Sequence, residues 1–152
     1  MARISNVYRM VITALLASLG FSCPFYGVEE YGTPHATYKA KGVVVSEADN
    51  SPIQGIRASL LRYYSYDDEP FSYPIATAYT DNEGFFFLRG GESSRRLKLF
   101  VELLDVDGEA NGSFARLEIE ADYSNKTFTG SSGNWNLGEA EINLGTIKMK
   151  PE

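Results

Sequence analysis

Residues 41–61 read KGVVVSEADNSPIQGIRASLL, and this stretch decides the fold. Its run of three valines is typical of a β-strand, and the run ends at a cluster of turn-forming residues around Pro52. A second apolar pattern follows, in which Ile56, Ala58 and Leu60 alternate with other residues and would share one face of a strand. The stretch therefore predicts two short strands joined by a turn.

The same pattern continues along the chain. Together with the opening pair, it predicts seven strands, at residues 36–46, 55–64, 73–80, 84–88, 95–105, 113–122 and 140–149. The segments RLKLFVEL and FARLEIEAD alternate cleanly between apolar and polar residues, which is typical of a sheet with one face in water. No segment after residue 23 has the capped amphipathic pattern of a helix. These features predict an all-β protein, a seven-stranded antiparallel β-sandwich.

The first 22 residues have the composition of a cleaved secretory signal. They contain two arginines and no acid, followed by an apolar run over residues 10–21 that is short of the ~20 residues a membrane span needs. We therefore predict a signal peptide at 1–22, a flexible tether at 23–35 and the β-sandwich domain at 36–152. Cleavage would remove both arginines and move the net charge from −6 to −8.

The chain has one cysteine, Cys23, and it lies immediately after this segment. The run LASLGFSC resembles a bacterial lipobox, in which the cysteine sulfur receives a diacylglyceryl group before cleavage. This predicts that Cys23 is acylated and holds the protein on a membrane, most simply the outer membrane of a Gram-negative bacterium. The alternative is a general signal-peptidase site, with small residues at Gly20 and Ser22 and Cys23 merely next in line.

Composition excludes several classes of function. A net charge of −6 argues against nucleic acid as a partner, because phosphate binding needs clustered Lys and Arg. A lone cysteine excludes an internal disulfide and a cysteine-based zinc site. The only histidine, His35, has no second imidazole with which to share a metal or a proton. We therefore expect no cofactor and no enzymatic activity.

Motifs in the sequence resemble those of two known groups of proteins. The arrangement KGVVVSEADNSPIQGIRASLL, then TDNEGFFFL, resembles the transthyretin-like or carboxypeptidase-regulatory-like sandwich, within the immunoglobulin-like class of architectures. Its motif positions are occupied here by Gly42, Val44, Pro52, Gly55, Thr80, Asp81, Gly84 and Phe86. Such a resemblance implies a fold and leaves the function open.

A closer resemblance covers most of the chain after Cys23. EYGTPHATYKAKGVV, DVDGEANGSF and the closing NLGTIKM are similar to the lipoproteins associated with radical SAM enzymes in Gram-negative anaerobes. The resemblance implies a genetically linked radical SAM enzyme as partner. It leaves two roles open: a binding or structural module, or a substrate protein that the enzyme modifies. A secreted glycan- or protein-binding domain without a lipid anchor is the further alternative.

An acidic stretch is a candidate calcium site. DVDGEANG places Asp105, Asp107, Glu109 and Asn111 at alternate positions, which resembles an oxygen-ligand calcium loop. An EF-hand loop counted from Asp105 lacks its glycine and its final acid, however. The alternative is a simple acidic turn between two strands.

Aromatic residues supply a candidate partner surface. YYSYDDEPFSYP, at residues 63–74, lies between two predicted strands and includes Tyr64, Tyr66 and Phe71. The only tryptophan, Trp135, lies in a polar, glycine-rich setting. Such residues can anchor a glycan or a protein. The alternative is that they cover the core at strand ends.

Overall fold

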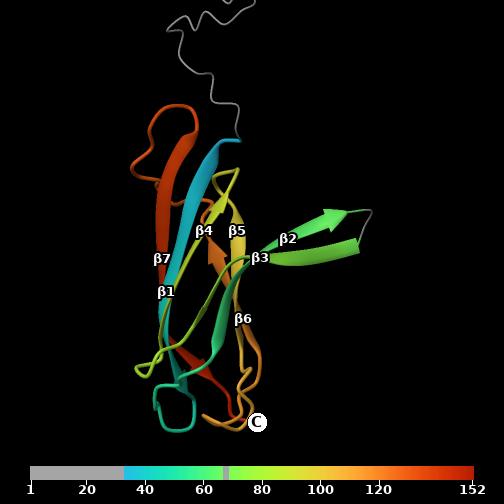
Figure 1. The fold of residues 1–152 in the computed structure, drawn as a ribbon, viewed down its shortest axis with the longest axis vertical. Coiled ribbons are helices and arrows are strands. Elements are labelled where there is room, and N and C mark those ends of the chain that lie inside the picture. Colours follow the sequence, from blue (N-terminus) through green and yellow to red (C-terminus); the bar gives the residue numbers. More distant parts are fainter. Residues whose placement is uncertain (1–32, 67–68) are drawn as a thin grey trace, which may run out of the picture. The chain divides into compact units, whose positions relative to one another are not determined.

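The computed structural model describes residues 33–66 and 69–152, so the predicted signal peptide, Cys23 and the start of the tether lie outside the described residues. The described part forms seven strands and no helix (Figure 1). The strands are β1 (His35–Ser46), β2 (Arg57–Tyr66), β3 (Glu69–Tyr79), β4 (Phe85–Glu92), β5 (Lys98–Leu104), β6 (Leu117–Asp122) and β7 (Asn136–Met149). In this part of the chain, nothing helical is long and apolar enough to cross a membrane.

The strands form two sheets, of order β4-β1-β7 and β3-β2-β5-β6. The predicted all-β sandwich of seven strands is confirmed. One pair departs from the antiparallel prediction, because β1 and β7 run parallel, from His35 beside Asn136 to Ser46 beside Met149. β6 ends at the same end of the sandwich at which β1 begins, and the chain crosses there to the other sheet to start β7. A pairing of strands so far apart in sequence leaves no local pattern that could predict its direction.

The core lies between the sheets and receives side chains from both. β4 shows the alternation most clearly, since Phe86 is buried while Phe85 and Phe87 on either side are exposed. Tyr38 and Tyr123 are fully buried, with ring centroids 4.8 Å apart in an edge-to-face contact. Tyr38 donates a hydrogen bond to the Ser94 carbonyl oxygen, and Tyr123 donates one of 2.6 Å to the Lys39 carbonyl oxygen. Each phenol therefore packs in the core with its hydroxyl satisfied.

The turn before β4 is formed by the Thr80, Asp81 and Gly84 positions of the motif. The Asp81 carboxylate accepts a 2.9 Å hydrogen bond from the Phe85 amide, and the Thr80 hydroxyl accepts one of 3.0 Å from the Ile56 amide. Gly84 has φ +73°, and a Cβ there would lie 2.3 Å from the Val44 carbonyl oxygen. Only glycine fits this turn against β1.

The boundaries of β2 and β3 differ from the prediction. β2 continues to Tyr66 and β3 begins at Glu69, so most of residues 65–72, which lie between the two predicted strands and were expected to be a loop, is strand. The prolines and acids within residues 63–74 indicated a loop, but the tyrosines and phenylalanine there favour paired strands and form cross-strand contacts.

The buried tyrosines predict a loss of stability in alkali. Burial raises the pKa of Tyr38 from 10.0 to about 12, and it raises that of Tyr123 well above its usual range. Between pH 10 and 12 the unfolded chain releases protons that the folded protein keeps, so stability falls as the pH rises. Denaturant unfolding at both pH values should show Tyr38 contributing about 2 kcal/mol to this loss. Tyr38→Phe, which cannot ionise, should lose less than the wild type, and an equal loss in the two proteins would contradict the assignment.

Candidate binding site on the β2–β3 arm

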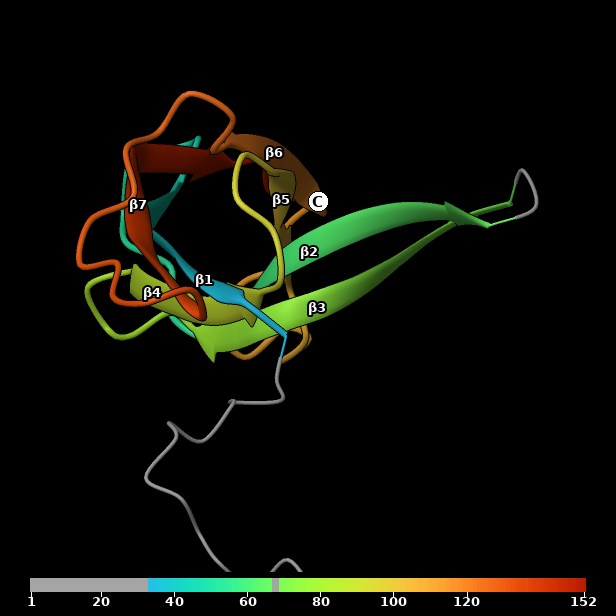
Figure 2. The same ribbon diagram turned by 90° about the horizontal axis from the view of Figure 1, so that it is seen from above.

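The outer halves of β2 and β3 form a two-stranded arm. β5 pairs with β2 only from Arg57 to Leu61, whereas β3 stays paired with β2 as far as Tyr66. Residues 62–66 and 69–73 are therefore paired only with each other, and we call them the arm. Figure 2 shows this hairpin extending beyond the other strands. Two-stranded hairpins are marginal in water by themselves, so contacts at its base must hold the arm in place.

A β-bulge marks the base of the arm. The register of β2 and β3 shifts between Leu60, which pairs with Ala76, and Leu61, which pairs with Pro74, so that Ile75 is the extra residue. Bulges bend a strand and increase its twist, which redirects the hairpin away from the sandwich. The Ile75 backbone packs closely on β4, because a Cβ on Gly90 would lie 2.6 Å from the Ile75 carbonyl oxygen.

One face of the arm continues the core-facing side of β2. Ala58 and Leu60 are buried, and the period of two places Arg62 and Tyr64 on the same face further along the strand. Phe71 is the direct cross-strand partner of Tyr64, and Tyr73 is that of Arg62. The arm therefore presents an inner face that the opposite sheet covers only at its base, through Glu92 at the end of β4.

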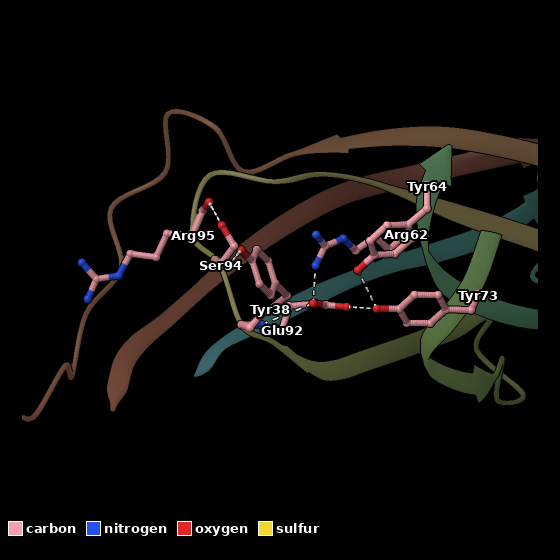
Figure 3. Close-up of polar contacts among 8 residues, drawn as sticks. Tyr38, Arg62, Tyr64, Tyr73, Glu92, Ser94 and Arg95 are labelled. Atoms are coloured by element: carbon pink, nitrogen blue, oxygen red, sulfur yellow. Dashed lines mark hydrogen bonds and ion pairs between the residues drawn. The ribbon is translucent and has the colours of Figure 1, made fainter. Parts of the chain in front are cut away.

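The side chains of this face are organised (Figure 3). The Tyr64 ring stacks on Phe71, with centroids 5.5 Å apart, and on Tyr73, with centroids 5.3 Å apart. The Arg62 guanidinium lies 4.3 Å from the centroid of the Tyr64 ring. Contacts of this kind hold the aromatic rings in one arrangement before any partner arrives.

Glu92 joins the arm to the end of β4. Its side chain is buried and receives hydrogen bonds from Arg62, with which it forms an ion pair, and from the Tyr73 hydroxyl (Figure 3). The Tyr64 and Tyr73 hydroxyls lie 2.9 Å apart. Because the Tyr73 proton points to the carboxylate, Tyr64 is the donor in this second bond. The hydrogen bond to Glu92 raises the pKa of Tyr73 well above its usual range.

The opposite face of the arm is fixed to the four-stranded sheet. Tyr63 makes an edge-to-face contact with Phe100, with centroids 5.1 Å apart, and donates a 2.7 Å hydrogen bond to the Glu118 carboxylate. Tyr63 is 41% exposed, so this face also remains accessible to solvent.

The inner face is suited to contact with a protein. Phe71 is 49% exposed and Tyr73 is 37% exposed, so part of each residue is accessible to a partner. The Tyr64 ring stacks on Phe71 and Tyr73 and is partly exposed. Rigid aromatic rings beside an arginine are the residue types that dominate protein interfaces. Pro70 and Pro74 lack amide donors and guard the arm against pairing with another strand.

The sequence identified part of this surface. Tyr64 and Phe71 come together as the prediction required. Tyr66 ends β2 opposite Glu69, and its side chain lies outside the described residues. Trp135 is not on the arm; it is half-buried before β7, and its carbonyl oxygen accepts a 2.8 Å hydrogen bond from the His35 amide.

Sequence reasoning missed three members of the site: Arg62, Tyr73 and Glu92. Extending the alternation of Ala58 and Leu60 by one step would have placed Arg62 on the inner face. Nothing local to Glu92 predicts its role, because its partners lie on two other strands.

The predicted calcium loop is held by its own hydrogen bonds. The Asp105 carboxylate accepts hydrogen bonds from the amides of Asp107, at 3.3 Å, and Phe114, at 3.1 Å. The Asp107 carboxylate accepts one from the Asn111 side chain. Glu109 and Asn111 are exposed. Within residues 33–66 and 69–152, no three His, Cys, Asp or Glu residues are grouped so as to hold a metal. Calcium binding stays a prediction.

Comparisons with known proteins give only distant structural likenesses. No family model and no curated protein matches the sequence. The C-terminal domain of the shaft pilin spaA from Lactobacillus rhamnosus GG is similar over 76% of this chain and 98% of that one, at 10% identity and a TM-score of 0.43. The group B streptococcus pilus 2b backbone protein matches over 74% of this chain and 40% of that one, at 11% identity and 0.44. Hydroxyquinol 1,2-dioxygenase from Pseudomonas putida DLL-E4 matches over 91% and 71%, at 11% identity and 0.40. Likenesses at this level do not bear on function.

The close packing at the base of the arm predicts different costs at two adjacent glycines. Gly90→Ala would place a Cβ against the backbone of Ile75 and should lower the free energy of unfolding by about 1–3 kcal/mol. Gly91→Ala is the matched control, since its Cβ would meet nothing nearer than the Ala36 carbonyl oxygen at 3.9 Å. It should change stability by less than about 0.5 kcal/mol in denaturant unfolding. Equal effects of the two substitutions would rule out the proposed role of Gly90.

Proposed function

We propose that this protein is a lipid-anchored, non-enzymatic β-sandwich of the cell envelope that binds a protein partner through the inner face of the arm. The observation that carries the proposal is the uncovered row of Tyr64, Phe71 and Tyr73, held by Arg62 and Glu92. A partner would take the place that the opposite sheet occupies over the rest of β2. Such contacts remove aromatic surface from water without requiring the protein to reorganise first.

The anchor in this proposal is Cys23, supported by its position after a basic end and a short apolar run. The proposed location is the outer membrane of a Gram-negative bacterium. The radical SAM enzyme implied by the sequence resemblance is the first partner to test. The enzyme would either bind the arm or modify the chain.

A photo-crosslinking amino acid at residue 71 tests the arm in cells that contain the linked enzyme. We expect a covalent adduct with a single envelope or enzyme partner. Tyr79 is the matched control position, because it is 59% exposed on the same strand but lies outside the arm. Equal adduct yields at positions 71 and 79, or none at 71, would exclude the arm as the binding surface.

Affinity measurement with the crosslinked partner then gives the size of the effect. Tyr64→Ser combined with Phe71→Ser should weaken binding by at least about tenfold, because each substitution removes an aromatic anchor. Tyr79→Ser should leave affinity within about twofold of the wild type. Circular dichroism and thermal unfolding check that both proteins keep the sandwich.

Substitution of Cys23 tests the anchor. The wild-type protein should partition with membranes, and its intact mass should show loss of residues 1–22 and addition of acyl chains. Cys23→Ala should be soluble or should retain residues 1–22, since it has no sulfur to acylate. Normal membrane partition of Cys23→Ala would exclude lipid anchoring. The same mass measurement, with and without the radical SAM enzyme, reports modification, and equal masses would exclude the substrate role.

A further inference from the structure

The end of the sandwich at which the chain enters has a cationic hollow. β1 begins there at His35, beside the start of β7 at Asn136, and Glu92 at the end of β4 pairs with Ala36. The loops before β5 and before β7 therefore lie at this same end (Figure 1). They enclose a hollow of about 530 Å³ lined by Arg95, Arg96, Ser124, Asn125, Lys126, Thr127 and Phe128. We call this the basic hollow.

Its three cations are available to a ligand. Among the described residues, Arg95, Arg96 and Lys126 form no ion pair, as is also true of Arg57, Arg89, Lys148 and Lys150 elsewhere on the domain. The Arg95 guanidinium lies 5.9 Å from the centroid of the Phe128 ring, which holds it over the hollow. Figure 3 shows Arg95 directed away from Glu92 and Arg62.

The nearest acids are already engaged. Glu92 is paired with Arg62, and the Asp122 carboxylate accepts a 2.8 Å hydrogen bond from the Ser124 amide. Hydrogen bonding by the Ser124 side chain, and then by its backbone amide, holds the pKa of Asp122 below its usual range. The hollow therefore keeps an excess of positive charge in a protein whose net charge is −6.

Arg96 is in an unusual backbone conformation. Its φ of +62° lies in the left-handed region, where side chains other than those of Gly, Asn and Asp are rare. A residue with a β-carbon is strained there by on the order of 1 kcal/mol relative to glycine.

The position of the hollow limits what can reach it. Only nine residues lie between Cys23 and Thr33, where the described chain begins, so the ten residue steps allow a membrane holding Cys23 to be at most about 35 Å from this end. This step rests on the proposed lipid anchor. Within that reach, the most abundant anions are the phosphates of the lipid headgroups.

We propose that the basic hollow binds the phosphates of anionic phospholipids in the leaflet that carries the anchor. Binding orients the sandwich with its chain-entry end on the bilayer. Arg95 and Arg96 supply hydrogen bonds in the geometry that phosphate oxygens accept, and Lys126 adds a point charge. The far end, where β7 ends, then faces away from the membrane.

Trp135 provides the readout, because it is the only tryptophan and lies at the chain-entry end. The mature lipoprotein is reconstituted into vesicles that carry a headgroup quencher, with or without an anionic phospholipid. We expect stronger quenching of Trp135 in the anionic vesicles, and the increment should disappear at high salt. Equal quenching in both kinds of vesicle would overturn the proposal.

Two triple variants show which cations produce the increment in quenching. R95Q/R96Q/K126Q should lose the increment, since removing three cations lowers the docked population on the order of a hundredfold. R57Q/K148Q/K150Q is the matched control, because it removes the same charge from the opposite end and should keep the increment. Persistence of the increment in the first variant would overturn the assignment. Thermal unfolding checks that both variants fold.

Flotation separates this inference from the proposed anchor. Flotation of the wild type with vesicles lacking anionic lipid reports the anchor alone. If the wild type floats only with anionic vesicles, and R95Q/R96Q/K126Q does not float with them, the lipid anchor is excluded and the headgroup site is supported. If the wild type floats with neither kind of vesicle, the anchor and the headgroup site are both excluded. Glycerol phosphate in solution is the remaining probe. Stabilisation of the wild type by it, without any vesicle increment, would make this a site for free phosphate and overturn the lipid proposal.

Discussion

The arm and the core beside it depend on one constraint. β2 belongs to the four-stranded sheet, and the three-stranded sheet covers only part of its length. β2 is buried between the sheets as far as Leu61, and β4, the strand that faces the base of the arm, ends at Glu92. Beyond Glu92, β2 continues to alternate between its two faces, so its inner face extends along the arm past the end of β4. The ion pair of Arg62 and Glu92 closes the core there, because it replaces apolar cover with paired charge. The bulge at Ile75 and the close approach of Gly90 follow from the same boundary, where β3 must leave the sandwich.

Breaking this ion pair would affect the core and the arm together. A buried carboxylate without its partner is costly, and Glu92 holds both Arg62 and Tyr73. The stacked tyrosines therefore depend on a residue at the end of a strand in the other sheet. This arrangement keeps a marginal hairpin in one conformation, which lowers the entropy cost of binding at its inner face.

The sequence predicted those features of the fold that depend on residues close together in the chain. The alternation of apolar and polar residues, and the turn-forming residues between these runs, predicted all seven strands. The sequence motif also included Asp81 and Gly84, and in the structure Gly84 lies directly against β1. The sequence was insufficient for pairing, because β1 and β7 are separated by most of the domain and no local pattern specifies a parallel neighbour. The arm was missed for a related reason. Its prolines and acids are typical of loops, and only the cross-strand partners Tyr64 and Phe71 make it a hairpin.

The two proposed surfaces are connected through Glu92. The start of the loop that carries Arg95 and Arg96 follows Glu92 directly, and the Ser94 carbonyl oxygen in that loop accepts a hydrogen bond from the buried Tyr38. The base of the arm and the basic hollow therefore share one rigid support. Because Arg62 neutralises Glu92, the negative charge nearest this loop does not compete for its arginines. If the hollow contacts lipid phosphate, the same support sets the direction of the arm. The inner face would then be presented to partners beside the membrane rather than beyond it.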